Sequence, residues 1–472
     1  MTHAPSRPHY NVTFVILALA GIVYALLQSV VVPALHEIQL DLNTSTVGVT
    51  WVFTAFLLSA SVATPILGRL GDMFGKKRLL LVSLGAVAAG TLVAALADSL
   101  GPLIVGRVIQ GLGGAIFPLA FGIIRDEFPR ERVATGIALI SAILGVGAGL
   151  GIVLAGPITT HLSYHWLFWL PLAPTVVAIV GTLFVVPESP VRTPGRVDLA
   201  GAVLLSGWLV ALLVGVSQSS SWGWTSARVL GLFALAGALL IAWVVVETRV
   251  QLPLVDMRMM RIRGVWTTNL SSLLFGFGMF SAFILVPQFV EMPTSTGYGF
   301  GASVTQAGLF LAPASFTMLF VSLVAGRLAR TIGPKLPLVL GSLASMAAFC
   351  ILAFAHSEHW AIYLGTTLMG VGVGFAFSAM ANLIVEAVPS EQTGVATGMN
   401  MIMRSIGGAV GGQVTASIVA GTVSAGLPTE AGFTAAFAVS GLALLATLVA
   451  TLFVPGRRAL GVASTPAFVR AE

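Results

Sequence analysis

Long apolar runs and short polar segments alternate along almost the whole of this 472-residue chain. A run of about 20 apolar residues gives an α-helix long enough to cross a hydrocarbon core of roughly 30 Å. The strands of a membrane β-barrel would instead show segments of about ten residues with alternating polarity. The pattern therefore predicts an all-α polytopic membrane protein. Its fourteen predicted helices lie near residues 12–35, 46–67, 79–97, 103–124, 134–155, 166–187, 198–217, 227–247, 265–289, 303–326, 337–355, 360–385, 394–420 and 433–454.

The composition agrees with a membrane protein. Charged residues make up 8% of the chain and hydrophobic residues 57%, whereas a soluble protein carries about 25% charged residues. A water-facing surface cannot be built from so few charges. The single cysteine, Cys350, excludes an intramolecular disulfide. The first apolar run is longer than the core of a secretory signal and has no Ala-x-Ala cleavage site, so we expect it to remain as the first span.

The basic residues predict the orientation, because Lys and Arg gather in cytoplasmic loops. With the amino terminus inside, 20 of the 23 Lys and Arg residues fall in inner segments, Arg228 lies outside, and Arg107 and Arg404 fall within spans. We therefore expect both termini to be cytoplasmic, in the plasma or inner membrane of the cell. The net charge of +6 is explained by this topology and by contact with anionic membrane lipid. Nucleic acid is not an expected partner, because no soluble basic domain is present to bind it.

The polar segment between the second and third runs, residues 68–78 with the sequence GRLGDMFGKKR, is the most distinctive in the chain. Its glycines allow a tight turn, and Asp72 is expected to meet arginines and the amino end of a following helical turn. The segment resembles the loop between helices 2 and 3 of the major facilitator superfamily. The resemblance implies a conformational latch between two halves of the protein, with simple topogenic charge as the alternative. The implied latch residues are Gly68, Asp72, Gly75, Lys76, Lys77 and Arg78.

A degenerate copy of this loop, residues 326–335, follows the predicted tenth helix and has Arg330 where the first copy has Asp72. Two six-helix halves are characteristic of the superfamily, and fourteen helices resemble its drug:proton antiporter branch. The resemblance, which extends over residues 12–455, includes local matches at residues 222–224, 253–258 and 306–313. The implied domains are an N-terminal six-helix bundle (12–187), two inserted helices with cytoplasmic linkers (188–264), a C-terminal six-helix bundle (265–455) and a cytoplasmic tail (456–472).

Residues 107–111, RVIQG, match the Arg-x-x-Gln-Gly motif in the fourth helix of this superfamily. Arg107 and Gln110 are three residues apart and share a helix face. A guanidinium within a span faces protein or water, because its exposure to hydrocarbon costs about 3 kcal/mol or more. The resemblance implies that Arg107, Gln110 and Gly111 take part in proton coupling. The alternative is that Arg107 extends to the outer interface.

Arg404 lies in the predicted thirteenth helix, about 15 Å from its start, at 1.5 Å per residue. Asn400 is four residues earlier and shares its face. The glycines that follow, Gly407 and Gly411 among them, form overlapping Gly-x-x-x-Gly pairs, which favour close helix packing. Arg404 is therefore either a polar group of a cavity or a clamp between helices beside the glycine seam.

Two features differ from the antiporter branch. The predicted fifth helix contains Gly147, Gly151, Gly156 and Pro157, which suit close helix packing, but it lacks the complete Gly-Pro-x-x-Gly-Gly motif. Tyr24 stands where the branch commonly has an aspartate in the first helix. No acidic residue is predicted in the middle of a span, although proton coupling normally requires an ionisable group that is reached from both sides.

A cavity between the two halves is implied by the family resemblance. Its polar candidates are Tyr24, Gln28, Asn269, Asn382, Asn400 and Arg404, and the aromatic residues Phe275, Phe283, Phe316 and Phe375 serve as packing or ligand contacts. Mostly apolar walls with a few amides suit a lipophilic substrate.

The expected function is export of drugs or secondary metabolites by alternating access, with proton antiport. The alternative is an uncoupled facilitator or metabolite importer of the same fold. Gly-x-Ser-x-Gly and His-Glu-x-x-His motifs do not occur, so an enzyme is not expected. We expect no cofactor and no metal, a proton gradient as driving force, and a monomer whose partners are its lipophilic substrate and membrane lipid.

Overall fold

The structure is a computed structural model, and it describes residues 10–44, 46–189, 198–251, 253–424 and 427–455. Residues 190–197 of the predicted linker and the predicted tail 456–472 lie outside the described residues. Six of the basic residues that predict the orientation lie outside them as well: Arg7, Arg192, Arg196, Arg457, Arg458 and Arg470.

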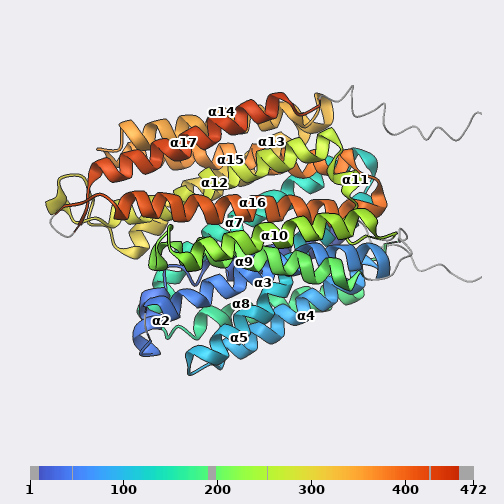
Figure 1. The fold of residues 1–472 in the computed structure, drawn as a ribbon, viewed down its shortest axis with the longest axis horizontal. Coiled ribbons are helices and arrows are strands. Elements are labelled where there is room, and N and C mark those ends of the chain that lie inside the picture. The colour runs from blue at the N-terminus through green and yellow to red at the C-terminus, as the bar shows by residue number, and fades with distance from the viewer. Residues whose placement is uncertain (1–9, 45, 190–197, 252, 425–426, 456–472) are drawn as a thin grey trace, which may run out of the picture.

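In the described part of the chain, fourteen long helical segments follow one another (Figure 1). They are α1 (Tyr10–Ser29), α3 (Thr46–Phe74), α4 (Lys76–Ala95), the continuous segment α5 (Leu100–Gly111), η1 (Leu112–Ala115) and α6 (Ile116–Glu127), then α7 (Arg130–His161), α8 (Trp166–Phe184), α9 (Leu199–Trp222), α10 (Ala227–Arg249), α12 (Arg263–Glu291), α13 (Val304–Thr331), α14 (Lys335–Phe354), α15 (His359–Ala387), α16 (Thr393–Ala420) and α17 (Glu430–Leu452). The short elements are α2 (Leu35–Asp41), α11 (Met257–Met260), η2 (Thr294–Thr296), η3 (Ser390–Gln392) and the antiparallel pair β1 (Val423–Ser424) and β2 (Leu427–Pro428).

Among the described residues, thirteen of these segments are long and apolar enough to cross a membrane. The exception is α16, which has 28 residues but contains many glycines together with Asn400, Arg404 and Gln413. Most of its residues are buried by neighbouring helices, so it needs less apolar surface than a lipid-facing helix. The all-α polytopic fold is confirmed, with α16 as the fourteenth helix by its length and its place in the bundle. The orientation of the bundle in the membrane stays a prediction.

One end of the bundle, which we call the basic end, carries most of the described cations. It contains 14 of the 17 Lys and Arg residues within the described ranges, while Arg228 lies at the opposite end and Arg107 and Arg404 lie inside. Lys335 Nζ donates a hydrogen bond to Leu452 O at 2.9 Å, at the carboxyl end of α17. Cations are favoured there because the helix dipole places negative charge at the carboxyl end.

Two long helix pairs join the predicted halves: α3 packs on α16, and α7 packs on α13. At the basic end, a Cβ on Gly68 would lie 2.8 Å from Gly394 O in α16, and a Cβ on Gly326 would lie 2.8 Å from a Cα atom of α7. Gly75 and Gly333, one in each copy of the loop, both have a positive φ, 112° and 107°. The two copies of the loop therefore share a glycine with a left-handed φ, and each follows a helix that contacts the other predicted half.

The glycines of the predicted fifth helix lie at close contacts of α7 with two different neighbours. A Cβ on Gly147 or on Gly151 would lie 2.6 Å or 2.1 Å from side chains of α1. Gly156 faces the other predicted half, since its Cβ would lie 2.5 Å from a side chain of α13. Pro157 lies within α7. Small residues thus allow α7 to pack between α1 and α13.

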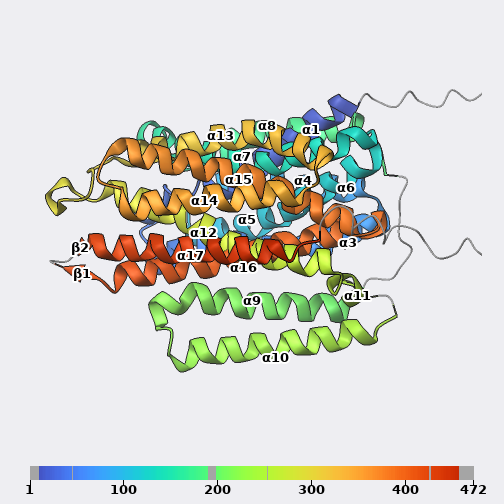
Figure 2. The same ribbon diagram turned by 90° about the horizontal axis from the view of Figure 1, so that it is seen from above.

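The two inserted helices, α9 and α10, lie side by side along one side of the bundle (Figure 2). α9 contacts both α3 and α16, and the hydroxyls of Thr54 and Ser217 lie 3.5 Å apart. After α9, Trp224 Nε1 donates a hydrogen bond to Ser417 Oγ at 3.0 Å. The insert therefore contacts both predicted halves.

Glu247 joins the basic ends of the inserted helices. Its side chain is 3% exposed, and it accepts hydrogen bonds from Trp243 Nε1 at 3.0 Å and from Val255 N at 3.1 Å. Asp198 caps α9 by accepting a hydrogen bond from Gly201 N at 2.9 Å. A Cβ on Gly201 would lie 2.5 Å from an oxygen of each of these two acids, so both carboxylates meet at the start of α9.

Candidate functional site

The carboxylate of Asp72 lies between the predicted halves at the basic end. Asp72 is in the last turn of α3 and is 1% exposed. Its oxygens accept hydrogen bonds from Gly394 N at 3.4 Å and Val395 N at 3.3 Å, in the first turn of α16. The amino end of a helix stabilises a carboxylate. The sequence predicts that the following helix supplies this end; the structure places α16 there instead, because the contact between Gly68 and Gly394 brings α3 and α16 together.

Lys76 holds the buried acids of this region together. It is the first residue of α4 and is fully buried. Its Nζ lies 2.6 Å from Asp126 Oδ2 and 3.8 Å from Asp72 Oδ1. The hydroxyl of Ser189 also donates a hydrogen bond to Asp126. A buried lysine is tolerated when acids and hydrogen bonds surround it, and here it fixes the ends of α3, α4 and α6 to one another.

Arg125, near the end of α6, is a second link between the predicted halves. It donates hydrogen bonds to Val388 O at 2.8 Å, Pro389 O at 3.2 Å and Thr393 Oγ1 at 2.5 Å. Two of these acceptors, Val388 O and Pro389 O, directly follow α15, so the guanidinium meets the negative end of that helix, and Thr393 is the first residue of α16. In the sequence, Arg125 is one of the 20 cations that predict the orientation, and nothing near it along the chain indicates this distant partner.

Gly75, Lys77 and Arg78 lie on the side of the loop that faces Glu188. Lys77 N donates a hydrogen bond to Glu188 Oε1 at 3.1 Å, and Arg78 Nε lies 3.7 Å from Glu188 Oε2 with 68% of the arginine side chain exposed. A Cβ on Gly75 would lie 2.6 Å from the same carboxylate. Since Glu188 directly follows the predicted N-terminal bundle, these contacts do not connect the two halves.

Arg107 is fully buried in α5. Its Nε and Nη1 donate hydrogen bonds to Val52 O and Leu27 O, both at 2.9 Å, and Nη1 also donates to Gln110 Oε1 at 2.7 Å. The guanidinium carbon lies 4.3 Å from the centre of the Phe56 ring. The side chain therefore joins α1 and α3 to α5 inside the bundle and does not extend to the outer interface.

Gln110 and Gly111 complete this motif. Gln110 Nε2 donates a hydrogen bond to Thr91 Oγ1 at 3.0 Å, in α4. A Cβ on Gly111 would lie 2.5 Å from Ser59 Cβ in α3. The motif thus fixes α5 tightly against α3 and α4.

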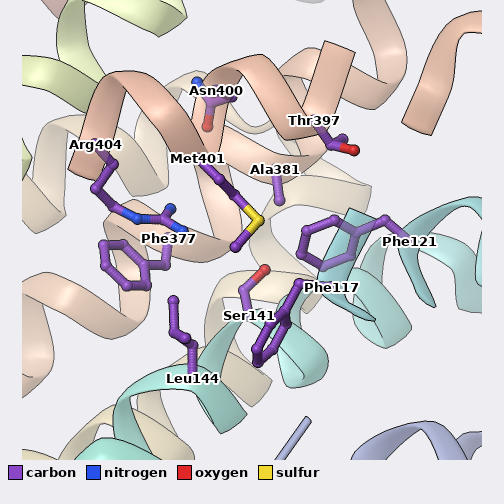
Figure 3. Close-up of a pocket in the computed structure, with 10 residues that line it drawn as sticks. All are labelled: Phe117, Phe121, Ser141, Leu144, Phe377, Ala381, Thr397, Asn400, Met401 and Arg404. Carbon is purple, nitrogen blue, oxygen red and sulfur yellow. The ribbon is translucent and has the colours of Figure 1, made fainter. Parts of the chain in front are cut away.

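A small enclosed cavity lies between the predicted halves (Figure 3). Its volume is about 10 Å³, which is room for about one water molecule. Residues of α6, α7, α15 and α16 line it: Phe117, Phe121, Ser141, Leu144, Phe377, Ala381, Thr397, Asn400, Met401 and Arg404. A larger ligand can enter only if the two groups of helices separate.

Arg404 is both a polar group of the cavity and part of a helix that packs closely on its neighbour. Its side chain lines the cavity and is 8% exposed, with its guanidinium carbon 4.1 Å from the centre of the Phe377 ring (Figure 3). Its helix also packs closely on α12, because Cβ atoms on Gly407 and Gly411 would lie 1.8 Å and 2.4 Å from carbonyl oxygens of α12.

The other predicted cavity residues surround the cavity without lining it in this conformation. Asn269 accepts a hydrogen bond at 2.9 Å from Asn400, which does line the cavity. Asn382 donates a hydrogen bond at 3.3 Å to a carbonyl of α7, across the interface. Tyr24 is buried against aromatic rings of α3 and α6. Gln28 is partly exposed at the end of α1.

The aromatic lining differs from the sequence prediction. Phe117, Phe121 and Phe377 line the cavity. The prediction for Phe316 is wrong, because its side chain is 65% exposed on the outside of α13. Phe275 is fully buried and packs behind the lining, with its ring centre 6.1 Å from that of Phe377. The four-residue spacing of Phe117 and Phe121 indicates a shared helix face, but the direction of that face depends on the neighbouring helices.

Acidic side chains of the long helices lie near helix ends in the described ranges. Asp72, Glu247 and Glu291 are in the last turns of α3, α10 and α12. None of the ten residues that line the cavity is acidic. Arg404 is therefore the one charged residue of this lining.

Comparison with known proteins identifies the fold family. The Major Facilitator Superfamily model matches residues 17–412. The tetracenomycin C resistance and export protein of Streptomyces glaucescens is 28% identical over 399 residues, which cover 84% of this chain and 73% of that protein. Multidrug resistance protein 3 of Bacillus subtilis is 27% identical over 400 residues, with 84% and 77% covered. The human organic anion transporter MFSD10 shares the fold, with a TM-score of 0.65 at 16% identity over 94% of this chain and 100% of that one. Since the family model matches most of its length, the chain belongs to the major facilitator superfamily of membrane transporters.

Proposed function

We propose that this transporter exports lipophilic drugs or secondary metabolites across the plasma or inner membrane by alternating access. The observation that carries the proposal is the central cavity, which has mostly apolar walls and is formed by helices of both predicted halves. A site in this position is exposed to one side or the other when the two halves rock. The names of the relatives, a tetracenomycin C export protein and a multidrug resistance protein, support the same class of cargo. The proposed working unit is a monomer without a cofactor.

The proposed latch consists of Asp72 and Arg125. Both residues extend from the N-terminal half to the turn that begins α16. Separation of the halves would break the contacts of Asp72 with Gly394 and Val395 and would expose both charges to water. In the orientation predicted from the basic residues, this opening would connect the cavity with the cytoplasm. Lys76 would keep the Asp72 carboxylate in place.

Proton antiport is the proposed driving reaction, with Asp72 linking protonation to the latch. A proton on Asp72 would remove the charge that the α16 amino end and Lys76 stabilise. Arg107, Gln110 and Gly111 would contribute to coupling by keeping α1, α3 and α5 together as one body. The lack of an acid in the cavity lining favours the alternative, an uncoupled facilitator or importer.

A drug-susceptibility panel tests the proposal in a bacterial host that lacks its main efflux pumps. We expect expression of the protein to raise tolerance to lipophilic antibiotics, and we expect a protonophore to stop the efflux of a fluorescent member of the panel. Unchanged tolerance to the whole panel, with the protein verified in the membrane, would contradict export. Efflux that persists after the proton gradient has collapsed would favour the uncoupled alternative.

A further inference from the structure

Arg404 is a buried cation without a polar partner. It lies about 16 Å along α16 from the first residue of that helix. Within the described residues its guanidinium forms neither an ion pair nor a hydrogen bond, and its carbon lies 4.1 Å from the centre of the Phe377 ring. Arg107 is a useful comparison, because that fully buried arginine donates to three acceptors. A buried charge that lacks partners is unfavourable, so Arg404 is a site where an anion would be stabilised.

The other polar groups of the cavity cannot neutralise Arg404. None of the ten lining residues carries a carboxylate. The hydroxyls of Ser141 and Thr397 donate hydrogen bonds at 2.7 Å to carbonyls of their own helices. The amide nitrogen of Asn400 donates to side chains of α12. The N–H groups of Arg404 are thus the donors that this lining leaves free for a ligand.

The walls around the guanidinium are apolar and aromatic. Phe117 and Phe121 come from α6, opposite Arg404 and Phe377 (Figure 3), and Leu144 of α7 also lines the cavity. Aromatic walls pack well on planar ring systems. The low dielectric constant of such surroundings strengthens the attraction of an anion to Arg404 and the repulsion of a cation.

We propose that this cavity, when open, binds an organic anion that has an aromatic body and a carboxylate or similar acidic group, and that Arg404 recognises the charge. The proposal rests on the proposed function only because it takes the central cavity as the cargo site. The planar guanidinium can donate two parallel hydrogen bonds to a carboxylate. Cationic drugs are disfavoured, because the lining offers a positive charge and no acid.

Equilibrium binding to the full-length protein in lipid nanodiscs tests this selectivity. The probe is tritiated 1-naphthaleneacetate, and the competitors are 1-naphthaleneacetamide, 2-(1-naphthyl)ethylamine and acetate. The first three compounds share an aromatic body with a negative, neutral or positive head group, and acetate has the head group alone. We expect the acid to bind about tenfold more tightly than the amide, with the amine and acetate weaker still.

Arg404→Gln should reduce the affinity for the acid about tenfold or more while leaving that for the amide nearly unchanged. Arg404→Lys should retain a preference for the acid, because the charge remains. Arg228→Gln, which removes a cation at the end of the bundle opposite the basic end, is the matched control and should bind like the wild type. If Arg404→Gln fails to fold, the relative affinities of the wild type and of Arg404→Lys for the acid, the amide and the amine still test the proposal.

Several results would overturn the proposal: equal binding of amine and acid to the wild type, acid binding that survives Arg404→Gln, or no acid binding up to ~1 mM. Competition by acetate as strong as that by naphthaleneacetate would indicate a site for small anions. It would overturn the inference that the cavity recognises an aromatic body. Binding requires neither a gradient nor export, so the two proposals can fail separately. Arg404-dependent binding without efflux would contradict the proposed function alone, and efflux that prefers amines would contradict this inference alone.

Discussion

Replacement of Asp72 by asparagine should weaken the closure of the basic end and leave the helix packing intact. The amide is nearly the same size and can still accept one N–H from Gly394 or Val395, but the negative charge is lost. The two contacts, at 3.4 Å and 3.3 Å, are long for hydrogen bonds. The main loss is therefore the interaction with the helix dipole, which reaches about 2 kcal/mol at partly buried sites. A loss of about 1–2 kcal/mol would shift the ratio of closed to open molecules by a factor of roughly 5–30.

Distances between spin labels measure this shift directly. Arg78→Cys and Ile332→Cys place labels at exposed positions in the two predicted halves at the basic end. The background is Cys350→Ser, because Cys350 is the single cysteine of the sequence and is exposed. In nanodiscs, under conditions where the protein with Asp72 shows both a short and a long distance, Asp72→Asn should increase the long-distance population.

Glu188→Gln is the matched control for this experiment. It also neutralises an acid at the basic end, but its contacts, with Lys77 and with the Arg78 side chain that the label replaces, do not bridge the halves. We expect it to leave the distances unchanged. A distance distribution for Asp72→Asn that matches the one for Glu188→Gln would refute the latch and the reasoning from the α16 helix dipole.

Three further variants test the close approach of α3 to α16, the Arg107 clamp and the attachment of the inserted helices. Gly68→Ala should increase the long-distance population in the same assay, because a Cβ there would lie 2.8 Å from Gly394 O, whereas Gly85→Ala, which meets nothing within 4 Å, should not; equal effects would contradict the close approach. Arg107→Lys should lower the free energy of unfolding in detergent by roughly 2–4 kcal/mol, since a lysine cannot supply the same fork of donors. An unchanged melting temperature would contradict the role of Arg107 in joining α1, α3 and α5. Glu247→Gln should speed hydrogen exchange in residues 253–262, as a charged acceptor worth about 1.5–3 kcal/mol is lost, without changing transport; unchanged exchange would contradict its role in joining the insert.

The helices could be predicted because their lengths are set by the membrane, and the length of an apolar run is visible in the sequence. The rotation of each helix could not be predicted. Runs that are apolar on all sides have no polar face that indicates a direction. This is why the prediction chose Phe316, which is exposed outside the bundle, and missed Phe117 and Phe121, which line the cavity.

The latch illustrates the same limit for contacts between distant segments. The motif in residues 68–78 indicates the importance of Asp72. The N–H groups that donate to its carboxylate belong to Gly394 and Val395, which are 322 and 323 residues away. Arg125 has no comparable motif and reaches residues 263–268 positions away. Polar residues inside spans were easier to place: Asn400 and Arg404 both line the cavity, because groups that lipid cannot solvate must face the interior.

Gradient-driven transport through a latch at the basic end is tested most directly with purified protein in proteoliposomes. The accumulation of a radiolabelled compound that the susceptibility panel identifies as exported is measured under an imposed pH gradient. We expect accumulation that collapses with a protonophore and that falls about tenfold in Asp72→Asn, as expected for a loss of ~1.4 kcal/mol. Accumulation no greater than in protein-free liposomes, or equal in Asp72→Asn and the wild type, would contradict gradient-driven transport through this latch.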